Sequence, residues 1–316
     1  MTKFFFICIF ICLLVSCQIK QGSSSVSSFS SDDTVAVQTQ GFPFPEIPVT
    51  LTEPEDRKAW LLTHYWEQFN FADTALVNNR DVTEQGFVNF VALLVDGSTS
   101  EQLMRESLTR WCSQFMAEAH ACKVLMQTAD DYLYNPNSPF YNEALYGLYL
   151  EAVLDELPKE DVRRSAFNFK LTLLKRNNPG DKAMDFTYYL PDGTHRTLAA
   201  TSVKGDRLLL VFYDPECESC HAVLQQMSDD VTLAKEVKEG LISVLAIYTE
   251  GNDEVWRKAL PDMPKEWIIG TDHEAVKTGA LYDLKAMPSL YLLDGQKRVV
   301  LKDVSFEQLS TAIKRG

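Results

Sequence analysis

The sequence predicts two folded regions of different class: an all-α region, followed by an α/β region in which helices flank a central mixed sheet. From residue 48 to residue 176, apolar residues recur at steps of three and four, which is the period of an amphipathic helix. After residue 178, short apolar runs alternate with helical segments, which indicates a layered α/β fold. The 316 residues suffice for two domains, here called the helical region (48–176) and the α/β region (178–316).

The first residues have the pattern of an export signal. The apolar run from Phe4 to Val15 is too short to span a bilayer and suits the apolar core of a signal peptide. It ends in Leu14-Val15-Ser16-Cys17, which resembles the lipobox of a bacterial lipoprotein. We therefore expect removal of residues 1–16 and a lipid on Cys17. An ordinary signal peptide with a chance cysteine is the alternative.

This interpretation predicts a lipid-anchored protein of the bacterial cell envelope that faces the periplasm. Gln18 lacks the aspartate that retains some lipoproteins at the inner membrane, which favours the outer membrane. Residues 17–47 are rich in Ser, Gln and Thr, then in Pro, and are expected to form a flexible tether. Without residues 1–16, which hold one lysine and no acid, 29 basic and 44 acidic residues leave a charge near −15. Such an acidic surface argues against binding nucleic acid.

The helical region is predicted to begin with a capping box, Thr52-Glu53-Pro54-Glu55, in which Pro54 occupies the first turn. Its clearest stripe predicts one continuous helix, with Cys112 and Cys122 on the same apolar face. Ten residues of helix rise about 15 Å, whereas bridged cysteines have Cα atoms about 4.4–6.8 Å apart. These two thiols are therefore predicted to be unpaired in the core. The stripe consists of Met104, Leu108, Trp111, Cys112, Phe115, Ala119, Cys122 and Met126.

The α/β region is predicted as a series of short strands and helices. Arg207–Tyr213 and Leu241–Tyr248 are apolar throughout, as expected of strands buried on both faces of a sheet. The other expected elements are a strand at Met184–Leu190 with a turn at Asp192-Gly193, a broken helix from Cys217 to Glu239, helices near Glu254–Leu260 and Glu274–Tyr282, a hairpin of Leu290–Leu293 and Arg298–Leu301 around Asp294-Gly295, and a last helix capped by Ser305.

Cys217-Glu218-Ser219-Cys220-His221 is the motif that carries chemistry. As C-x-x-C it is a redox dithiol, and as C-x-x-C-H it is the attachment signature of a c-type haem. The motif directly follows the buried strand 207–213 rather than lying among helices and loops, which favours the dithiol. A zinc site is disfavoured because there is a single C-x-x-C and the other histidines lack ligand spacing. No metal or other cofactor is therefore expected.

The physical case for the dithiol rests on the start of a helix. At a helix N-terminus, free backbone N–H groups and the positive dipole end favour a thiolate on Cys217. Cys220 lies one turn further along, close enough to attack a mixed disulfide on Cys217. In an exported chain this pair would meet an oxidising compartment, where disulfides persist.

The order of an apolar strand, a C-x-x-C that opens a helix, and Met287-Pro288 before a strand and hairpin resembles the thioredoxin layout. Gly180 to Phe186 resembles the entry of the TlpA-like, or redoxin, group of thiol–disulfide oxidoreductases. The resemblance covers residues 178–316, and the helical region resembles a domain of uncharacterised function that precedes such modules in some bacterial lipoproteins.

The resemblance implies an enzyme that exchanges disulfides with protein substrates and takes electrons from a membrane or periplasmic donor. Cys217 would be the nucleophile and Cys220 the resolving cysteine. Pro288 would be a cis proline facing the dithiol, and Met287 would offer its backbone to an extended substrate segment.

Several residues depart from the thioredoxin pattern. Val211 stands where thioredoxin has a buried aspartate, so that proton relay is absent. Glu216 and Glu218, together with Asp214, place carboxylates around Cys217, which we expect to disfavour its thiolate. His221 would oppose them if protonated, or be a solvated helix residue. These residues predict a less acidic, more reducing dithiol than that of a strong oxidase, and hence a reductase or isomerase.

Two other functions stay open from the sequence. The helical region could make this a scaffold lipoprotein that captures a partner, with the dithiol secondary. Ala183 to Phe186 also resembles the entry of peroxiredoxins, which would predict a thiol peroxidase. Against this, Asp214 occupies the place of the Thr or Ser that precedes a peroxidatic cysteine by three positions.

Overall fold

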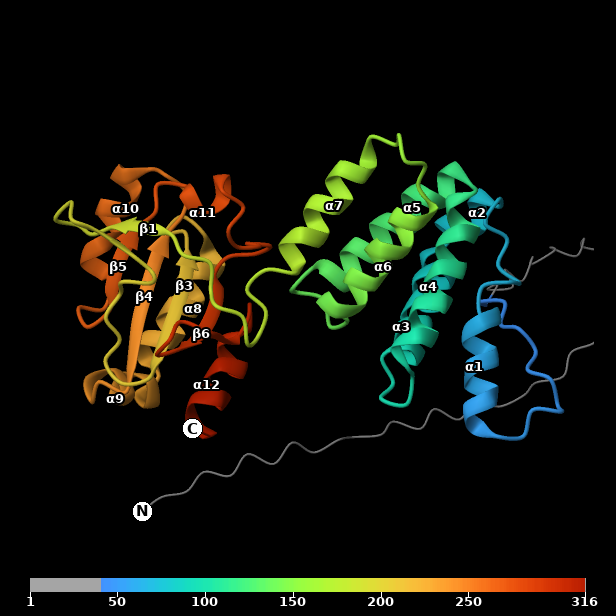
Figure 1. Cartoon of the computed structure of the whole chain (residues 1–316), viewed down its shortest axis with the longest axis horizontal. Helices are drawn as coiled ribbons and strands as arrows, with labels where there is room; N and C mark the ends of the chain where they lie inside the picture. The colour runs from blue at the N-terminus through green and yellow to red at the C-terminus, as the bar shows by residue number, and fades with distance from the viewer. Residues whose placement is uncertain (1–40, 316) are drawn as a thin grey trace, which may run out of the picture. The chain divides into compact units, whose positions relative to one another are not determined.

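The computed structural model describes residues 41–315 (Figure 1). The predicted signal peptide, Cys17 and the tether up to residue 40 lie outside the described residues. Gly41–Gly316 belong to one compact unit. Among residues 41–315, no helix combines the length and the apolar character needed to cross a membrane.

Helices alone make up the helical region. Their bounds are α1 (Pro54–His64), α2 (Thr74–Asn78), α3 (Arg80–Leu94), α4 (Glu101–Met116), α5 (Ala119–Ala129), the π-helix η1 (Asp130–Tyr134), α6 (Glu143–Glu156) and α7 (Arg163–Leu174).

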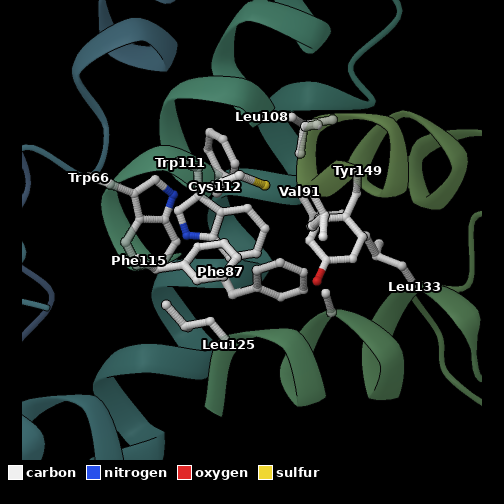
Figure 2. Close-up of a cluster of buried hydrophobic side chains, with 14 of the residues drawn as sticks. Trp66, Phe87, Val91, Leu108, Trp111, Cys112, Phe115, Leu125, Leu133 and Tyr149 are labelled. Carbon is white, nitrogen blue, oxygen red and sulfur yellow. The ribbon is translucent and has the colours of Figure 1, made fainter. Parts of the chain in front are cut away.

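Aromatic side chains fill the core of the helical region. Figure 2 shows Trp111 of α4 among rings from other elements, with Trp66 beside it. The ring centroids of Trp111 lie 5.7 Å from Trp66, 5.3 Å from Phe87 and 5.8 Å from Tyr149. These distances are typical of packed aromatic pairs, which bury large apolar areas. Trp66 and Trp111 are thus core residues, and for Trp111 this agrees with its place on the apolar stripe.

The last part of the predicted tether lies on this core. The ring of Phe42 packs 5.0 Å from that of Tyr65 and 5.8 Å from that of Phe69. A Cβ at Gly86 of α3 would come within 2.2 Å of the Phe42 ring. Residue 86 must therefore be glycine for Phe42 to sit where it does.

The stripe that predicted one long helix is divided between two. Helix α4 ends at Met116 and α5 begins at Ala119, so the prediction of a continuous helix is wrong. The axial separation of Cys112 and Cys122 along one helix consequently does not apply. Both are nonetheless buried free thiols in the same core, as predicted.

The predicted capping box at the start of α1 is also wrong. The N-cap is Glu53, and no side chain caps the helix. The Thr52 hydroxyl instead donates to the carboxylate of Glu53, at 3.4 Å. Pro54 does occupy the first turn, where its missing N–H is not needed.

The α/β region contains a seven-stranded sheet within the described residues, in the order β2-β1-β5-β4-β3-β6-β7. Strand β3 pairs in parallel with β4 and antiparallel with β6, so the predicted mixed sheet is confirmed. The strands are β1 (Thr187–Tyr189), β2 (His195–Thr197), β3 (Arg207–Tyr213), β4 (Ile242–Tyr248), β5 (Ile268–Thr271), β6 (Ser289–Asp294) and β7 (Val299–Leu301). The helices are α8 (Glu218–Asp229), α9 (Val231–Lys238), α10 (Asp253–Ala259), the 3₁₀-helix η2 (Leu260–Asp262), α11 (Ala275–Thr278) and α12 (Phe306–Arg315).

Alternation along β3 separates the two faces of the sheet. Leu209, Val211 and Tyr213 belong to one buried cluster, and the residues between them belong to the other. Cys220 lies in the first cluster, against the face that contains Val211. Strand β3 ends at Tyr213 and α8 begins at Glu218, so the short connection between them places the dithiol at this end of the sheet. Figure 1 shows α8 beside the strands of this sheet.

Candidate active site at Cys217

Cys217 lies at the N-terminus of α8, four residues after Tyr213, the last residue of β3. It is the N-cap residue, with an extended backbone (φ −93°, ψ 120°), and its carbonyl accepts from the N–H of His221 at 3.1 Å. The first backbone N–H groups of α8 have no partner within the helix and lie at the positive end of its dipole. The sulfur of Cys217 is partly exposed at this end.

Ser219 joins Cys217 to the loop before β6. Its hydroxyl oxygen lies 2.9 Å from Cys217 Sγ and 2.8 Å from the carbonyl oxygen of Met287. Its single proton can be donated to either, and a thiolate on Cys217 draws it to the sulfur. The same carbonyl lies 3.9 Å from Cys217 Sγ. The hydrogen bond from Ser219 lowers the pKa of Cys217 below its ordinary value, with help from the backbone amides of Ser219 and Cys220 that outweighs partial burial.

Cys220 differs from Cys217 in burial. It is fully buried, and its Sγ accepts a hydrogen bond from the N–H of Asp214 at 3.4 Å. Burial raises the pKa of Cys220 to about 12. All four cysteines among residues 41–315 carry free thiols.

The Met287–Pro288 peptide bond is cis, the geometry that the resemblance implied. Pro288 is followed at once by Ser289, the first residue of β6, which pairs with Phe212 near the end of β3. The antiparallel pairing of β3 and β6 thereby brings Met287 next to Cys217, 70 residues earlier in the chain.

Glu216, Glu218 and His221, predicted to tune the dithiol, are exposed. Within residues 41–315, none of the three is hydrogen-bonded or ion-paired to the Cys217 sulfur. The His221 ring donates to the carbonyl of Pro215 at 2.5 Å. The pKa of Cys217 is lowered, and no carboxylate is among the main causes of its shift. That neighbouring carboxylates disfavour its thiolate stays a prediction.

Two of these residues line a hollow beside the motif. Glu216 and His221 face α10 across a space of about 350 Å³, whose far wall includes Glu254 and Lys258. The residue that sequence reasoning missed is Ser219. The position of Ser219 between the two cysteines, in the first turn of α8, could have indicated a contact with Cys217. Its second contact, with Met287, could not be predicted because Met287 is distant in sequence.

The site does not suit covalent haem. Two thioether bonds would require both sulfurs to be accessible, whereas Cys220 is fully buried in the core beneath the sheet. Among residues 41–315, no group of three His, Cys, Asp or Glu side chains has a geometry that could hold a metal ion.

Known proteins resemble both the helical and the α/β region of this chain. A family model described as a domain of unknown function, DUF5106, matches residues 16–177. The crystal structure of a thioredoxin-like protein from Bacteroides caccae is 32% identical, covering 87% of this chain and 99% of that chain with a TM-score of 0.73. The chain belongs to the DUF5106-containing thioredoxin-like proteins.

This thioredoxin-like chain also resembles shorter structures. A conserved protein of unknown function from Bacteroides fragilis is 38% identical, covering 43% of this chain and 98% of that one, with a TM-score of 0.41. A domain of a possible thiol–disulfide isomerase from Cytophaga hutchinsonii is 27% identical, covering 45% and 94%, with a TM-score of 0.38. No curated protein matches the chain.

Membership of the thioredoxin-like proteins confirms the resemblance seen in the α/β region. The uncharacterised helical domain expected before it is likewise confirmed, as DUF5106. Together these findings support a thiol–disulfide redox function in general terms.

Proposed function

We propose that this thioredoxin-like chain exchanges disulfides with protein substrates, with Cys217 as nucleophile and Cys220 as resolving cysteine. The observation that carries the proposal is the contrast within one helical turn. Cys217 is partly exposed at the N-terminus of α8 with its pKa lowered, while Cys220 is buried behind it. An exposed thiolate beside a protected second thiol is the arrangement that two-step exchange requires.

In the first step, the Cys217 thiolate attacks one sulfur of a substrate disulfide. The substrate S–S bond breaks, a mixed disulfide forms on Cys217, and the other substrate sulfur leaves as a thiolate. In the second step, Cys220 attacks Cys217 Sγ as a thiolate, and its proton passes through water to the departing substrate thiolate. The Cys217–Cys220 disulfide forms, and the second substrate thiolate leaves. A membrane or periplasmic dithiol donor would then reduce the pair again.

Reduction or isomerisation is proposed in preference to disulfide donation. In donation, a substrate thiolate attacks Cys217 of the oxidised pair and expels Cys220. A thiol with a low pKa leaves readily, whereas the pKa of Cys220 is about 12. The poor leaving group slows donation. The lowered pKa of Cys217 brings it nearer to ambient pH, where an attacking thiol works best.

The loop before β6 is proposed to bind the substrate. The Met287 carbonyl faces the Cys217 sulfur, and Pro288 is cis. An extended peptide that offers its backbone to Met287 would present a disulfide directly to Cys217. Main-chain hydrogen bonds of this kind give affinity without demanding one side-chain sequence.

We further propose that the chain is exported and anchored by a lipid on Cys17, facing the periplasm from the outer membrane. The lipobox-like Leu14-Val15-Ser16-Cys17 supports this. Metabolic labelling with an alkyne fatty acid should mark the wild-type chain and leave Cys17→Ala unlabelled. Equal labelling of both would contradict the anchor.

Insulin reduction by the purified chain without its first 17 residues, with dithiothreitol as electron source, tests the activity. We expect Cys217→Ala to reduce insulin no faster than dithiothreitol alone. Cys112→Ala, which removes a thiol from the helical core, should retain wild-type turnover. Wild-type turnover at the background rate would contradict the proposed function.

A further inference from the structure

A buried group of charged side chains connects the helical region to the loop that precedes Pro288. At its centre is Lys285, whose side chain is 2% exposed. Its Nζ lies 2.5 Å from Glu143 Oε1, 3.1 Å from Asp283 Oδ2 and 3.5 Å from Asp303 Oδ2. Three carboxylates therefore surround one ammonium group that has almost no access to water.

Two of the contacts in this group come from the helical region. Glu143 is the first residue of α6, and its second oxygen lies 2.9 Å from Lys302 Nζ. The hydroxyl of Tyr134 donates to Asp283 at 2.8 Å. Burial opposes the charge on Glu143, but the two lysines outweigh it and hold its pKa below the ordinary value. Glu143 is consequently an ionised, half-buried partner for the α/β region.

The same group holds both ends of the segment around the cis proline, residues 284–289, here called the docking loop. Lys285 lies two residues before Met287. On the other side of Pro288, the hydroxyl of Ser289 donates to Asp303 Oδ1 at 2.6 Å. Asp303 thus contacts the loop at both ends, and Glu143 reaches it from the helical region.

We propose that Glu143 is a positioning residue for disulfide exchange: by pairing with Lys285, the helical region fixes the docking loop in the geometry that receives an extended protein segment. This inference rests on the proposed function of Cys217 and the loop. It assigns the helical region a part in selecting protein disulfides over small ones, because a small disulfide can reach Cys217 without the loop.

Glu143→Gln tests this without leaving a lone buried charge. In the wild type, two lysines, Lys285 and Lys302, face three carboxylates, Glu143, Asp283 and Asp303. The variant leaves two lysines and two carboxylates, and Lys285 keeps both remaining partners. Breaking a buried pair is severe mainly when it strands an uncompensated charge, so this variant is expected to fold.

Glu151→Gln is the matched control. Glu151 lies on the same helix, α6, and pairs with Arg105 and Lys175, both within the helical region. Glu143→Asp, which keeps the charge on a shorter side chain, tests rescue. Any variant whose Tm falls by more than the control's is assayed at a temperature where it is fully folded.

The first measurement compares insulin with hydroxyethyl disulfide as substrates. For Glu143→Gln we expect KM for insulin to rise about tenfold with kcat nearly unchanged, a change of about 1.4 kcal/mol. Turnover of the small disulfide should stay within about twofold, and Glu143→Asp should recover part of the loss. An equal loss on both substrates, or none on insulin, would overturn the positioning role.

The second measurement, amide hydrogen exchange, does not depend on turnover. Peptides that cover the docking loop should exchange faster in Glu143→Gln than in the wild type, while the exchange rate of peptides from β4 should not change. In the Glu151→Gln control, the docking loop should exchange at the wild-type rate. Unchanged exchange in the loop would overturn the inference. If the wild type reduced neither disulfide, the proposed function would fail, and the loop's exchange alone would decide whether Glu143 holds it.

Discussion

Cysteines occur in both regions of this thioredoxin-like chain, and their surroundings differ sharply. In the helical region, Cys112 lies inside α4 at 0% exposure and Cys122 lies on α5 at 8%. In the α/β region, Cys217 caps the N-terminus of α8, partly exposed, and Cys220 lies one turn behind it. All four are free thiols on or next to helices, so a helix alone does not make a thiol reactive.

The position along the helix and the nearest polar group account for the difference. Burial in an apolar core raises the pKa of Cys112 well above its ordinary value. At Cys217 the Ser219 hydroxyl and free helix amides lower the pKa. The same functional group is thereby made inert in one region and nucleophilic in the other.

The largest effect expected from this comparison is a trapped intermediate. Cys220→Ala removes the thiol that resolves a mixed disulfide on Cys217, so substrate proteins should stay attached through Cys217 in cells. Non-reducing electrophoresis with mass spectrometry identifies them. Cys122→Ala serves as the control and should trap nothing. The appearance of adducts on Cys112 or Cys122 instead would reverse the roles assigned to the two regions.

A substitution in the helical core should reduce the difference in reactivity between Cys112 and Cys217. Trp111 is 1% exposed among aromatic rings, and Trp111→Ala should cost about 3–5 kcal/mol of stability. Alkylation of Cys112 through opened states would then accelerate by about a hundredfold or more. Trp60→Ala, at a partly exposed ring that stacks on His64, should have a much smaller effect. Chemical denaturation and alkylation kinetics measure both, and equal effects would contradict the assigned core.

The smallest expected effect concerns Ser219. Ser219→Ala removes the main cause that lowers the pKa of Cys217, so the pH–rate curve for its alkylation should move to higher pH. A hydrogen bond contributes about 1 kcal/mol, which predicts about a fivefold slower reaction at pH 7. Ser228→Ala, whose hydroxyl donates to the carbonyl of Leu224 on the same helix, is the control. An unchanged curve in Ser219→Ala would mean that the helix amides alone suffice.

Patterns confined to consecutive residues predicted the fold well. Strand β3 runs from Arg207 to Tyr213 as predicted, because its apolar run is bounded by Asp206 and Asp214. The last helix is capped by Ser305, whose hydroxyl accepts from the N–H of Gln308 at 3.3 Å, also as predicted. Such signals are local, so tertiary contacts were not needed to read them.

The missed elements depend on contacts that a sequence pattern does not contain. Strand β5, Ile268–Thr271, is four residues long, includes Gly270, and is held in place by pairing with β4. The break between α4 and α5 falls at Ala117 and Glu118, which are ordinary helix formers, and the apolar stripe continues across it. Neither feature changes the spacing of apolar residues along the sequence, which is the signal from which the elements were predicted.

The candidate site divides in the same way. The dithiol was predicted from the C-x-x-C spacing, and the cis Met287–Pro288 bond was predicted from the resemblance to thioredoxin. The effect of Glu216 and Glu218 on the dithiol stays a prediction, because proximity in sequence does not fix how their carboxylates lie relative to the Cys217 sulfur. Ser219 was missed because its role depends on the Met287 carbonyl, which only the folded sheet brings near.

Site-resolved alkylation of the reduced, folded protein by iodoacetamide, followed by mass spectrometry across pH, tests the central claim most directly. Only the thiolate reacts, so each rate rises with pH, and a lowered pKa moves the curve to lower pH. We predict that Cys217 reacts first, with a midpoint below that of a free cysteine measured under the same conditions, while Cys112, Cys122 and Cys220 stay protected until unfolding. A Cys217 midpoint at or above that of free cysteine, or reaction of Cys112 at a similar rate, would contradict it.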